Sequence, residues 1–229
     1  MKGIFVTGTD TGVGKTVVSA AIVKALAKTG LSIGAMKPVE TGCREVAGLL
    51  DPSDGMFLRK IAGMDDSIDV VTPERYENPL APMVAAVLEN RPVNLEKVFE
   101  AFKGLSQRYE FMVVEGVGGL LVPISGDYFV SDLIKRLGLP VVIVARASLG
   151  TINHTLLTVK HASREGLEVK GVIINNHCPP ENSLAEKTNP DVLRGLCPVP
   201  VLGVLPYLEN VTGEGLDRLA DYIDIGLLV

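Results

Sequence analysis

The sequence predicts an α/β protein with a doubly wound, mainly parallel sheet and helices on both faces, in a single domain over residues 1–229. Short apolar, β-branched runs alternate with stretches of helical periodicity along most of the chain. The runs are continuously apolar, which is typical of parallel strands that are buried on both faces. A length of 229 residues suits one domain with a full core and would be cramped for two.

Six runs are predicted to form the sheet. In chain order they are residues 3–6, 32–36, 111–114, 141–145, 169–174 and 201–204. Three segments rich in turn-forming residues are predicted to be loops: 41–52, 72–82 and 178–183. None of these loops is long enough to link two domains. In a doubly wound sheet, ligands bind beyond the carboxyl ends of the strands, so functional residues are expected there.

The stretch 15–28 is predicted to be the first helix. Its apolar residues recur at three- and four-residue spacings and form one stripe: Val18, Ala21, Ile22, Ala25 and Leu26. Lys24 and Lys28 are expected to face outward, and Gly30 is expected to close the helix. The periodicity therefore predicts an amphipathic helix.

Composition and charge exclude several classes of function. Twenty-seven acidic residues outnumber 22 basic ones, so the chain lacks the basic surface of a nucleic-acid binder. The longest apolar run, 137–145, contains Pro140 and is too short to cross a membrane, and the N-terminus carries no secretory signal. We therefore expect a cytoplasmic protein. Its three scattered cysteines are predicted to be free thiols: Cys43, Cys178 and Cys197.

A glycine-rich segment, GTDTGVGKT at residues 8–16, follows the first predicted strand and opens the first helix. Such a loop binds phosphates through its backbone N–H groups, Lys15 would reach the terminal phosphates, and Thr16 would bind Mg²⁺. The pattern is a variant, because Gly8 precedes Gly14 by one position more than usual. ATP is the predicted nucleotide and GTP the second choice, since no guanine signature is present. A chance Gly-Lys-Thr is the alternative.

Charged residues follow two further strands. Lys37 comes directly after the second strand, where it would neutralise a phosphoryl group or hold an anionic substrate. Glu115 follows the third strand, at the usual place of a Mg²⁺-binding carboxylate in phosphate-loop proteins. The alternatives are a solvated surface lysine at Lys37 and, at Glu115, a carboxylate that points to water beside a tight glycine turn. Asp54 begins a predicted helix and is interpreted, from its position alone, as a capping residue. No zinc-ligand spacing and no activated nucleophile is recognisable.

Together these motifs resemble those of one family. Residues 5–16 (FVTGTDTGVGKT) closely resemble the opening of dethiobiotin synthetases, the ATP-dependent cyclising ligases of biotin biosynthesis. Further strings match that family in its order: KPV at 37–39 with TG at 41–42, VEGVGG at 114–119, LGTINH at 149–154 and NN at 175–176. The departures are small, since Gly12 stands where some relatives have an acid and Thr41 where some have serine.

The resemblance implies a carbon–nitrogen ligase that converts diaminopelargonate, CO₂ and ATP into dethiobiotin, ADP and phosphate. One amine of the substrate would capture CO₂ as a carbamate, the carbamate would attack the γ-phosphate to give a mixed anhydride, and the second amine would close the ring. Both reacting groups are anionic, so Lys15, Lys37 and Mg²⁺ would neutralise them. This route needs no protein nucleophile, in agreement with the sequence.

The same resemblance assigns roles to individual residues. Catalysis would depend on Lys37, Lys15 and Thr11. The ligands of Mg²⁺ would be Thr16, Asp54 and Glu115. Nucleotide contacts would come from Gly12, Val13, Gly14, Lys15, Thr16, Val17, Asp54, Glu115, Gly116, Val117, Gly118, Asn175, Asn176, Pro206, Tyr207 and Leu208. The substrate would contact Thr41 and, across the interface of a homodimer, Leu149, Gly150 and Asn153.

Two other classes of function stay open as alternatives. A partitioning or switch ATPase would need a membrane-targeting helix or a DNA-binding face, and neither residues 221–229 nor the charge balance indicates one. A protein that binds nucleotide without turnover is disfavoured by the joint presence of Lys15, Thr16 and Glu115. A ligase is therefore the predicted function.

Overall fold

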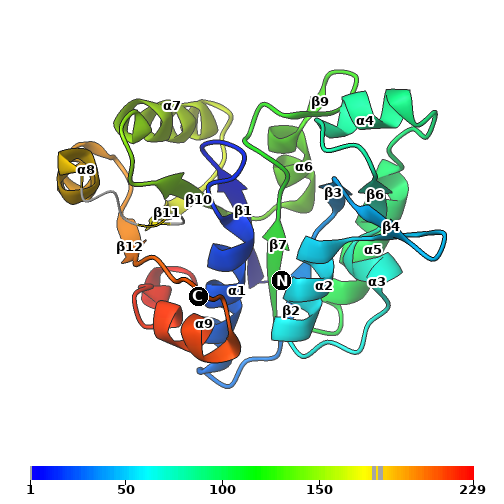
Figure 1. Cartoon of the computed structure of the whole chain (residues 1–229), viewed down its shortest axis with the longest axis horizontal. Coiled ribbons are helices and arrows are strands. Elements are labelled where there is room, and N and C mark those ends of the chain that lie inside the picture. Colours follow the sequence, from blue (N-terminus) through cyan, green and yellow to red (C-terminus); the bar gives the residue numbers. More distant parts are fainter. Residues whose placement is uncertain (1, 177–178, 180–182) are drawn as a thin grey trace.

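A computed structural model describes residues 2–176, 179 and 183–229, and its centre is a six-stranded parallel sheet (Figure 1). The strands are β1 (Lys2–Gly8), β2 (Ile33–Met36), β7 (Phe111–Glu115), β10 (Val141–Arg146), β11 (Val169–Asn175) and β12 (Val201–Leu205). They are the six predicted strands, with ends that differ by at most two residues. Parallel pairing joins every neighbouring pair in the order β12-β11-β10-β1-β7-β2. The predicted fold class is confirmed.

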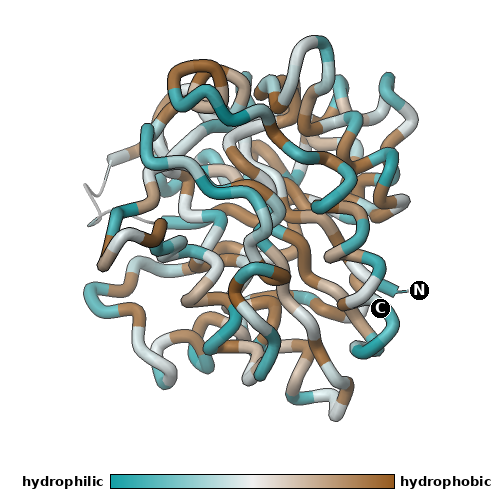
Figure 2. Tube along the Cα trace, turned by 90° about the vertical axis from the view of Figure 1, so that its right-hand side faces the viewer, coloured by the Kyte–Doolittle hydropathy of each residue, from teal (hydrophilic) through white to brown (hydrophobic). Residues whose placement is uncertain are grey.

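Helices cover both faces of this sheet. Successive residues of a strand point to opposite faces, and every residue of β7 is buried, as are the first five of β10. The helices are α1 (Lys15–Ala27), α2 (Ser53–Ile61), α3 (Ile68–Val71), α4 (Pro82–Leu88), α5 (Leu95–Ser106), α6 (Val130–Leu137), α7 (Thr151–Arg164), α8 (Leu184–Leu196) and α9 (Gly213–Ala220), with a 3₁₀ turn at Ile225–Leu227. Apolar stretches of the chain accordingly run through the interior (Figure 2).

The register of the sheet brings the functional strand ends together. β1 lies between β10 and β7, with Phe5 opposite Val141 on one side and Val114 on the other. Because all these strands run the same way, the loop after Gly8 lies beside the residues that follow Glu115. The Gly116 backbone N–H donates to the Val6 carbonyl at 2.9 Å, which ties the two strand ends to each other.

The predicted apolar stripe of the first helix is confirmed, since all five of its residues are buried, but burial extends beyond the stripe. Helix α1 is buried on nearly all sides, including the positions between the stripe residues, because α2 and α9 pack against it as well as the sheet. Lys24 and Lys28 do reach the surface, where their ammonium groups pair with Asp217 and Asp221 of the α9 region. The helix ends at Ala27, and Gly30 follows with the expected positive φ of 85°.

Two of the three predicted loops contain short strands, so those predictions are wrong in part. The segment 41–52 folds into a hairpin of β4 (Arg44–Val46) and β5 (Leu49–Asp51), while β3 (Val39–Thr41) pairs in parallel with β6 (Glu74–Tyr76). A second hairpin joins β8 (Pro123–Ser125) to β9 (Tyr128–Phe129). Ladders of two or three residues leave too little apolar pattern to be seen beside prolines and glycines. Most of the third segment, 178–183, lies outside the described residues.

Two further predictions concern thiols and membranes. Among the described residues, Cys43 and Cys197 are free, and burial raises the pKa of the Cys43 thiol to about 12. Cys178 lies outside the described residues. Within the part of the chain that the structure describes, no helix is both long enough and apolar enough to cross a membrane.

The centre of the sheet is expected to dominate stability. Ile143 in β10 is fully buried, so Ile143→Ala should lower the free energy of unfolding by about 2–5 kcal/mol, through lost apolar burial and the cavity left behind. Urea denaturation followed by circular dichroism measures the loss. Val46→Ala in the exposed β4–β5 hairpin is the control and should change the free energy by less than about 0.5 kcal/mol. Equal effects of the two substitutions would contradict a sheet-centred core.

Candidate active site

The phosphate loop joins β1 to α1 at the middle of the sheet edge. Gly14 occupies the N-cap position of α1 with φ 84°, a left-handed conformation that glycine adopts without strain, and no side chain caps this helix end. The free N–H groups of the first helical turn therefore face the loop and suit an anion. The Asp10 carboxylate accepts the Thr11 N–H at 2.7 Å and pairs with Arg146 at 2.9 Å, which fixes the outer part of the loop.

Lys15 lies folded back across the loop. Its side chain is largely buried, and toward the described residues the ammonium group donates only a long 3.4 Å hydrogen bond, to the Asp10 carbonyl. Burial, together with the positive charge of Lys37, lowers the pKa of Lys15 to about 8. An anionic ligand would stabilise the charged form of such a buried and weakly paired ammonium group. A nucleotide phosphate is a ligand of this kind.

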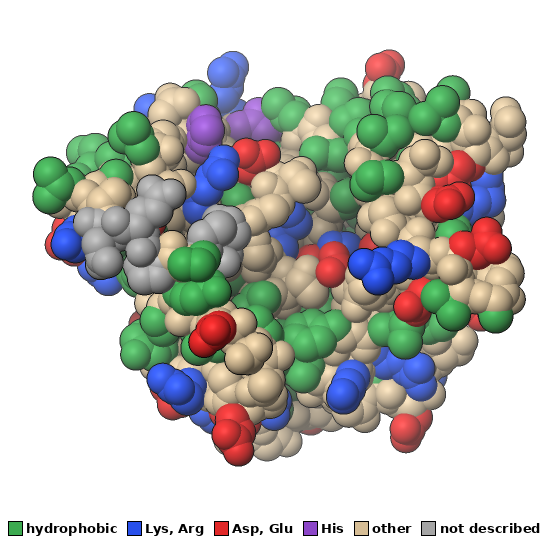
Figure 3. All heavy atoms as spheres, in the orientation of Figure 1, with side chains coloured by type: hydrophobic (Ala, Val, Ile, Leu, Met, Phe, Trp, Pro, Cys, Tyr) green, Lys and Arg blue, Asp and Glu red, His purple; other side chains and the backbone are tan. Residues whose placement is uncertain are grey.

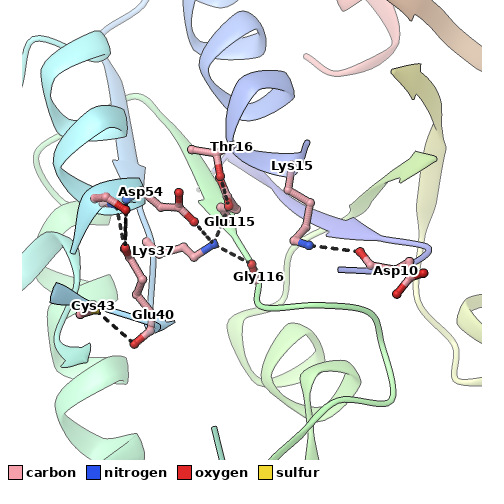
Figure 4. Close-up of polar contacts among 11 residues, drawn as sticks. Asp10, Lys15, Thr16, Lys37, Glu40, Cys43, Asp54, Glu115 and Gly116 are labelled. Atoms are coloured by element: carbon pink, nitrogen blue, oxygen red, sulfur yellow. Dashed lines mark hydrogen bonds and ion pairs between the residues drawn. The ribbon is translucent and has the colours of Figure 1, made fainter. Parts of the chain in front are cut away.

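Lys37 directly follows β2 and lies between two carboxylates, that of Glu115 at the end of β7 and that of Asp54 in the first turn of α2 (Figure 4). Its ammonium nitrogen is 2.5 Å from Glu115 Oε1 and 3.1 Å from Asp54 Oδ2, and it also donates to the Gly116 carbonyl at 3.1 Å. Burial by itself would lower the pKa of Lys37, but the adjacent Glu115 and Asp54 outweigh it and raise the pKa above its usual value. The ammonium group is therefore charged throughout the neutral range.

The oxygens around Lys37 fit a hard divalent cation. The Thr16 hydroxyl donates to Glu115 Oε1 at 2.9 Å, and Glu115 Oε2 is buried with no hydrogen-bond partner among the described residues. Such an orphaned carboxylate oxygen is costly unless a cation or donor reaches it. Hydroxyl and carboxylate oxygens are the ligands that Mg²⁺ prefers. Thr16, Asp54 and Glu115 thus form a donor set of the right chemistry.

Half of the predicted site residues line one cavity of about 270 Å³. Its walls are Thr11, Gly12, Gly14, Lys15, Thr16, Lys37, Glu40, Thr41, Asp54, Glu115, Val117 and Gly118. In the space-filling view, acidic and basic side chains meet in a hollow near the middle of this face (Figure 3). The capping role first given to Asp54 is wrong, because its carboxylate points to Lys37 instead. Sequence reasoning missed Glu40 as a residue of the site. A charged residue inside a strand could have pointed to it, because such a side chain is rarely buried without a role.

A second group of predicted residues gathers beside the start of α1. Asn175, Asn176, Pro206, Tyr207 and Leu208 line a small cavity of about 50 Å³ together with Val17, Val211 and Leu219. The Asn175 amide donates to the Val13 carbonyl at 3.0 Å, and the Asn176 amide donates to the Leu205 carbonyl at 2.8 Å. These bonds hold the ends of β11 and β12 against the phosphate loop.

The three residues predicted to act across a dimer interface lie away from both cavities. Leu149, Gly150 and Asn153 are exposed around the start of α7 and line neither of these cavities. A larger cavity of about 770 Å³ opens on the other side of the phosphate loop, between residues 8–11, the segment 119–122 and α7. The exposed Leu121 and Leu157 are among its walls.

Comparisons with known proteins show which family the chain is similar to. The model of a family described as "AAA domain" matches residues 2–215. An ATP-dependent dethiobiotin synthetase BioD of Thermodesulfovibrio yellowstonii is 51% identical over 225 residues, 95% of this chain and 94% of that protein. The protein of the same name from Bacillus subtilis strain 168 is 44% identical and covers 100% of this chain and 98% of its own length.

Similar solved structures support the fold alone. The septum site-determining protein MinD from Pyrococcus horikoshii, complexed with Mg-ADP, has a TM-score of 0.50 at 20% identity and covers 99% of this chain and 88% of its own. The signal recognition particle receptor FtsY from Elizabethkingia anophelis, in complex with GDP, has a TM-score of 0.52 at 15% identity, with 97% and 63% covered. Both are nucleotide-bound proteins with an α/β fold of this kind.

Proposed function

The chain belongs to the family of ATP-dependent dethiobiotin synthetases, ligases of biotin biosynthesis (EC 6.3.3.3), and from that premise we propose which of its residues carry each part of the reaction. The convergence of Lys15, Lys37 and the orphaned Glu115 oxygen on one cavity is the observation that supports the assignment. A partitioning or switch ATPase shares only the fold, whereas the family relation extends over nearly the whole chain.

Two lysines are proposed to stabilise the anionic reacting groups. The diamine captures CO₂ as a carbamate, and a carbamate oxygen attacks the γ-phosphorus as ADP leaves. The second amine then attacks the carbonyl carbon of the mixed anhydride, phosphate leaves, and the cyclic urea forms. Lys15 would hold the transferring phosphoryl group, and Lys37 would neutralise the carbamate and the charge that develops during transfer. Thr11 and Thr41 line the same cavity and would orient the substrate by hydrogen bonds.

Thr16, Asp54 and Glu115 are proposed to hold Mg²⁺. The ion would supply charge neutralisation to the phosphates. Glu115 Oε2 is available for this role because nothing described in the structure satisfies it. Lys37 now lies between the two carboxylates, so a bound cation would share them and leave the Lys37 ammonium group available to the substrate.

The nucleotide is proposed to lie along the phosphate loop. The backbone of residues 12–17 and of 116–118 would contact the phosphates, and Asn175, Asn176 and the segment 206–208 would contact the adenine. The cavity at that end holds about 50 Å³, the space of one or two water molecules. The base would therefore cover its mouth, or the segment after β12 would move outward to admit it.

We further propose a homodimer whose partner completes the substrate site through Leu149, Gly150 and Asn153. Leu149 is 88% exposed, and the exposed Leu121 and Leu157 flank the cavity beside α7. Apolar side chains exposed together are typical of an interface. Each subunit is taken as one domain over residues 1–229, since a single apolar core connects elements from β1 to the C-terminal turn. A cytoplasmic location stays a prediction.

The shared site makes a quantitative prediction. Lys37→Ala and Asn153→Ala should each reduce dethiobiotin formation strongly when assayed alone. Mixed and re-equilibrated, they should recover about a quarter of the wild-type activity, because half of the dimers are hybrids and each hybrid has one intact site. Titration of one variant with the other measures the recovery. An unchanged activity on mixing would mean that Asn153 serves the site of its own chain or none.

The decisive assay for the activity combines four components with the purified protein: ATP, Mg²⁺, bicarbonate and diaminopelargonate. Mass spectrometry should detect the cyclic urea, and phosphate should be released in equal amount. Omission of any one component should abolish both signals. Phosphate release that does not depend on the diamine, without cyclic urea, would discard these assignments and favour a switch ATPase.

A further inference from the structure

Helix α2 begins without a cap of its own. Its N-cap residue is Pro52, whose side chain accepts no hydrogen bond. The first backbone N–H groups of a helix have no partner within the helix, and a serine, threonine or aspartate at the N-cap normally satisfies one of them. The N–H groups of Asp54 and Gly55 therefore need an acceptor from another part of the chain.

Glu40 of strand β3 supplies both acceptors (Figure 4). Its Oε1 accepts the Asp54 N–H at 2.9 Å, and its Oε2 accepts the Gly55 N–H at 2.9 Å. The Glu40 side chain lies almost wholly out of solvent, with 4% of the residue exposed. Burial raises the pKa of Glu40, and the two N–H donors oppose that rise by stabilising the carboxylate. The positive end of the α2 dipole acts in the same direction.

The first turn of α2 is also held by close packing. Gly55 lies so near Thr72 that a Cβ atom there would come within 1.8 Å of the Thr72 hydroxyl oxygen. Any larger residue would push the first turn of α2 away from Thr72. The position of Asp54 is therefore set from two sides, by the Glu40 carboxylate and by the Thr72 side chain.

The segment from Lys37 to Glu40 thus contacts Asp54 twice. Lys37 contacts the Asp54 carboxylate, and Glu40 contacts its backbone N–H. We propose that Glu40 is a positioning residue that holds the Asp54 carboxylate where the divalent cation of the reaction is bound. This inference rests on the proposed role of Asp54 as a Mg²⁺ ligand. Groups that orient a metal ligand in this way typically change metal affinity by about 10–100-fold when they are removed.

The test measures cation binding directly. Titration of Mn²⁺ in the presence of ADP, followed by electron paramagnetic resonance, gives the dissociation constant without turnover. Glu40→Ala should weaken Mn²⁺ binding about tenfold. Glu40→Gln keeps the shape of the side chain and one hydrogen-bond acceptor, so it should weaken Mn²⁺ binding less. This variant provides the test if Glu40→Ala is unstable. Hydrogen exchange of the peptide over residues 53–58 should be faster in both variants.

Controls separate positioning from general stability. Glu74 of β6 is equally buried and accepts the Asn94 N–H at the start of α5, so Glu74→Gln should disturb packing without changing Mn²⁺ binding. Pro52→Ser, combined with Glu40→Ala, gives α2 a local cap and should restore part of the affinity. In an Asp54→Asn background, Glu40→Ala should have no further effect.

Each outcome decides a different question. Three results would overturn the positioning role of Glu40 while the Mg²⁺ site stands. They are unchanged Mn²⁺ binding in Glu40→Ala, an equal loss of Mn²⁺ affinity in Glu74→Gln, and additive losses of affinity when Glu40→Ala is combined with Asp54→Asn. Unchanged Mn²⁺ binding in Asp54→Asn alone, where Glu40 is intact, would show that the proposed metal role of Asp54 has failed, and the role of Glu40 would fall with it.

Discussion

Replacement of Lys37 by alanine should reduce the rate of dethiobiotin formation by about 10²–10³-fold, while the affinity for nucleotide changes little. Lys37 is 4% exposed, and its ammonium group contacts Glu115 and Asp54, the proposed Mg²⁺ ligands, in the cavity proposed for the substrate. In the proposed mechanism Lys37 neutralises charge on the carbamate and on the transferring phosphoryl group, so the loss of Lys37 should appear in kcat. Lys15 and the loop backbone, which we propose to bind the phosphates, are untouched by this substitution.

The interpretation needs a control for folding. Without Lys37, the fully buried Glu115 loses its cation, and an uncompensated buried charge costs about 3–5 kcal/mol. Thermal unfolding with Mg²⁺ present, and calorimetric titration with ADP, show whether the variant is folded and binds nucleotide. Lys24→Ala, on the outer side of α1, removes a partly exposed ion pair with Asp217 and should leave kcat unchanged. Wild-type turnover in the folded Lys37→Ala protein would remove Lys37 from the mechanism.

Residues at strand ends were the most predictable part of the site. Lys37 and Glu115 each follow a continuously apolar run, and parallel strands deliver such positions to one edge of the sheet. Local pattern was sufficient there because the strand itself carries the side chain to the site. Asp54 is different, since a carboxylate in the first turn of a helix is routine, and only the family resemblance gave it a metal role. Its contact with Lys37 spans 17 positions and depends on how α2 packs.

What the sequence could not predict depends on contacts between distant segments. Glu40 satisfies N–H groups 14 and 15 positions away, and no local signal marks the missing cap of α2 except Pro52 itself. The burial of α1 on nearly all sides requires α9, which comes almost 200 residues later. Amphipathic periodicity reports one buried face, and it fails when a second element covers the other face.

The substitution Glu115→Gln should have an effect as large as that of Lys37→Ala, but through the cation. Glutamine keeps the shape of the side chain and removes the negative charge that contacts Lys37 and the Thr16 hydroxyl and that we propose to bind Mg²⁺. We expect dethiobiotin formation to fall by about 10²–10³-fold, and the Mg²⁺ concentration for half-maximal rate to rise at least tenfold. The orphaned Glu115 Oε2, which is the strongest sign of a cation in the site, is the atom replaced.

A readout without turnover separates this effect from a defect in chemistry. Mg²⁺ and ADP together should raise the melting temperature of the wild-type chain by mass action, and Glu115→Gln should keep only the part due to ADP. Glu110→Gln, at the exposed position directly before the same strand, is the matched control and should keep the full rise. Because Glu115 contacts both Lys37 and Thr16, the Lys37→Ala and Glu115→Gln losses should not add in the double variant. Additive losses in the double variant would mean that Glu115 and Lys37 act separately. An unchanged effect of Mg²⁺ on the melting temperature of Glu115→Gln would mean that the cation binds elsewhere.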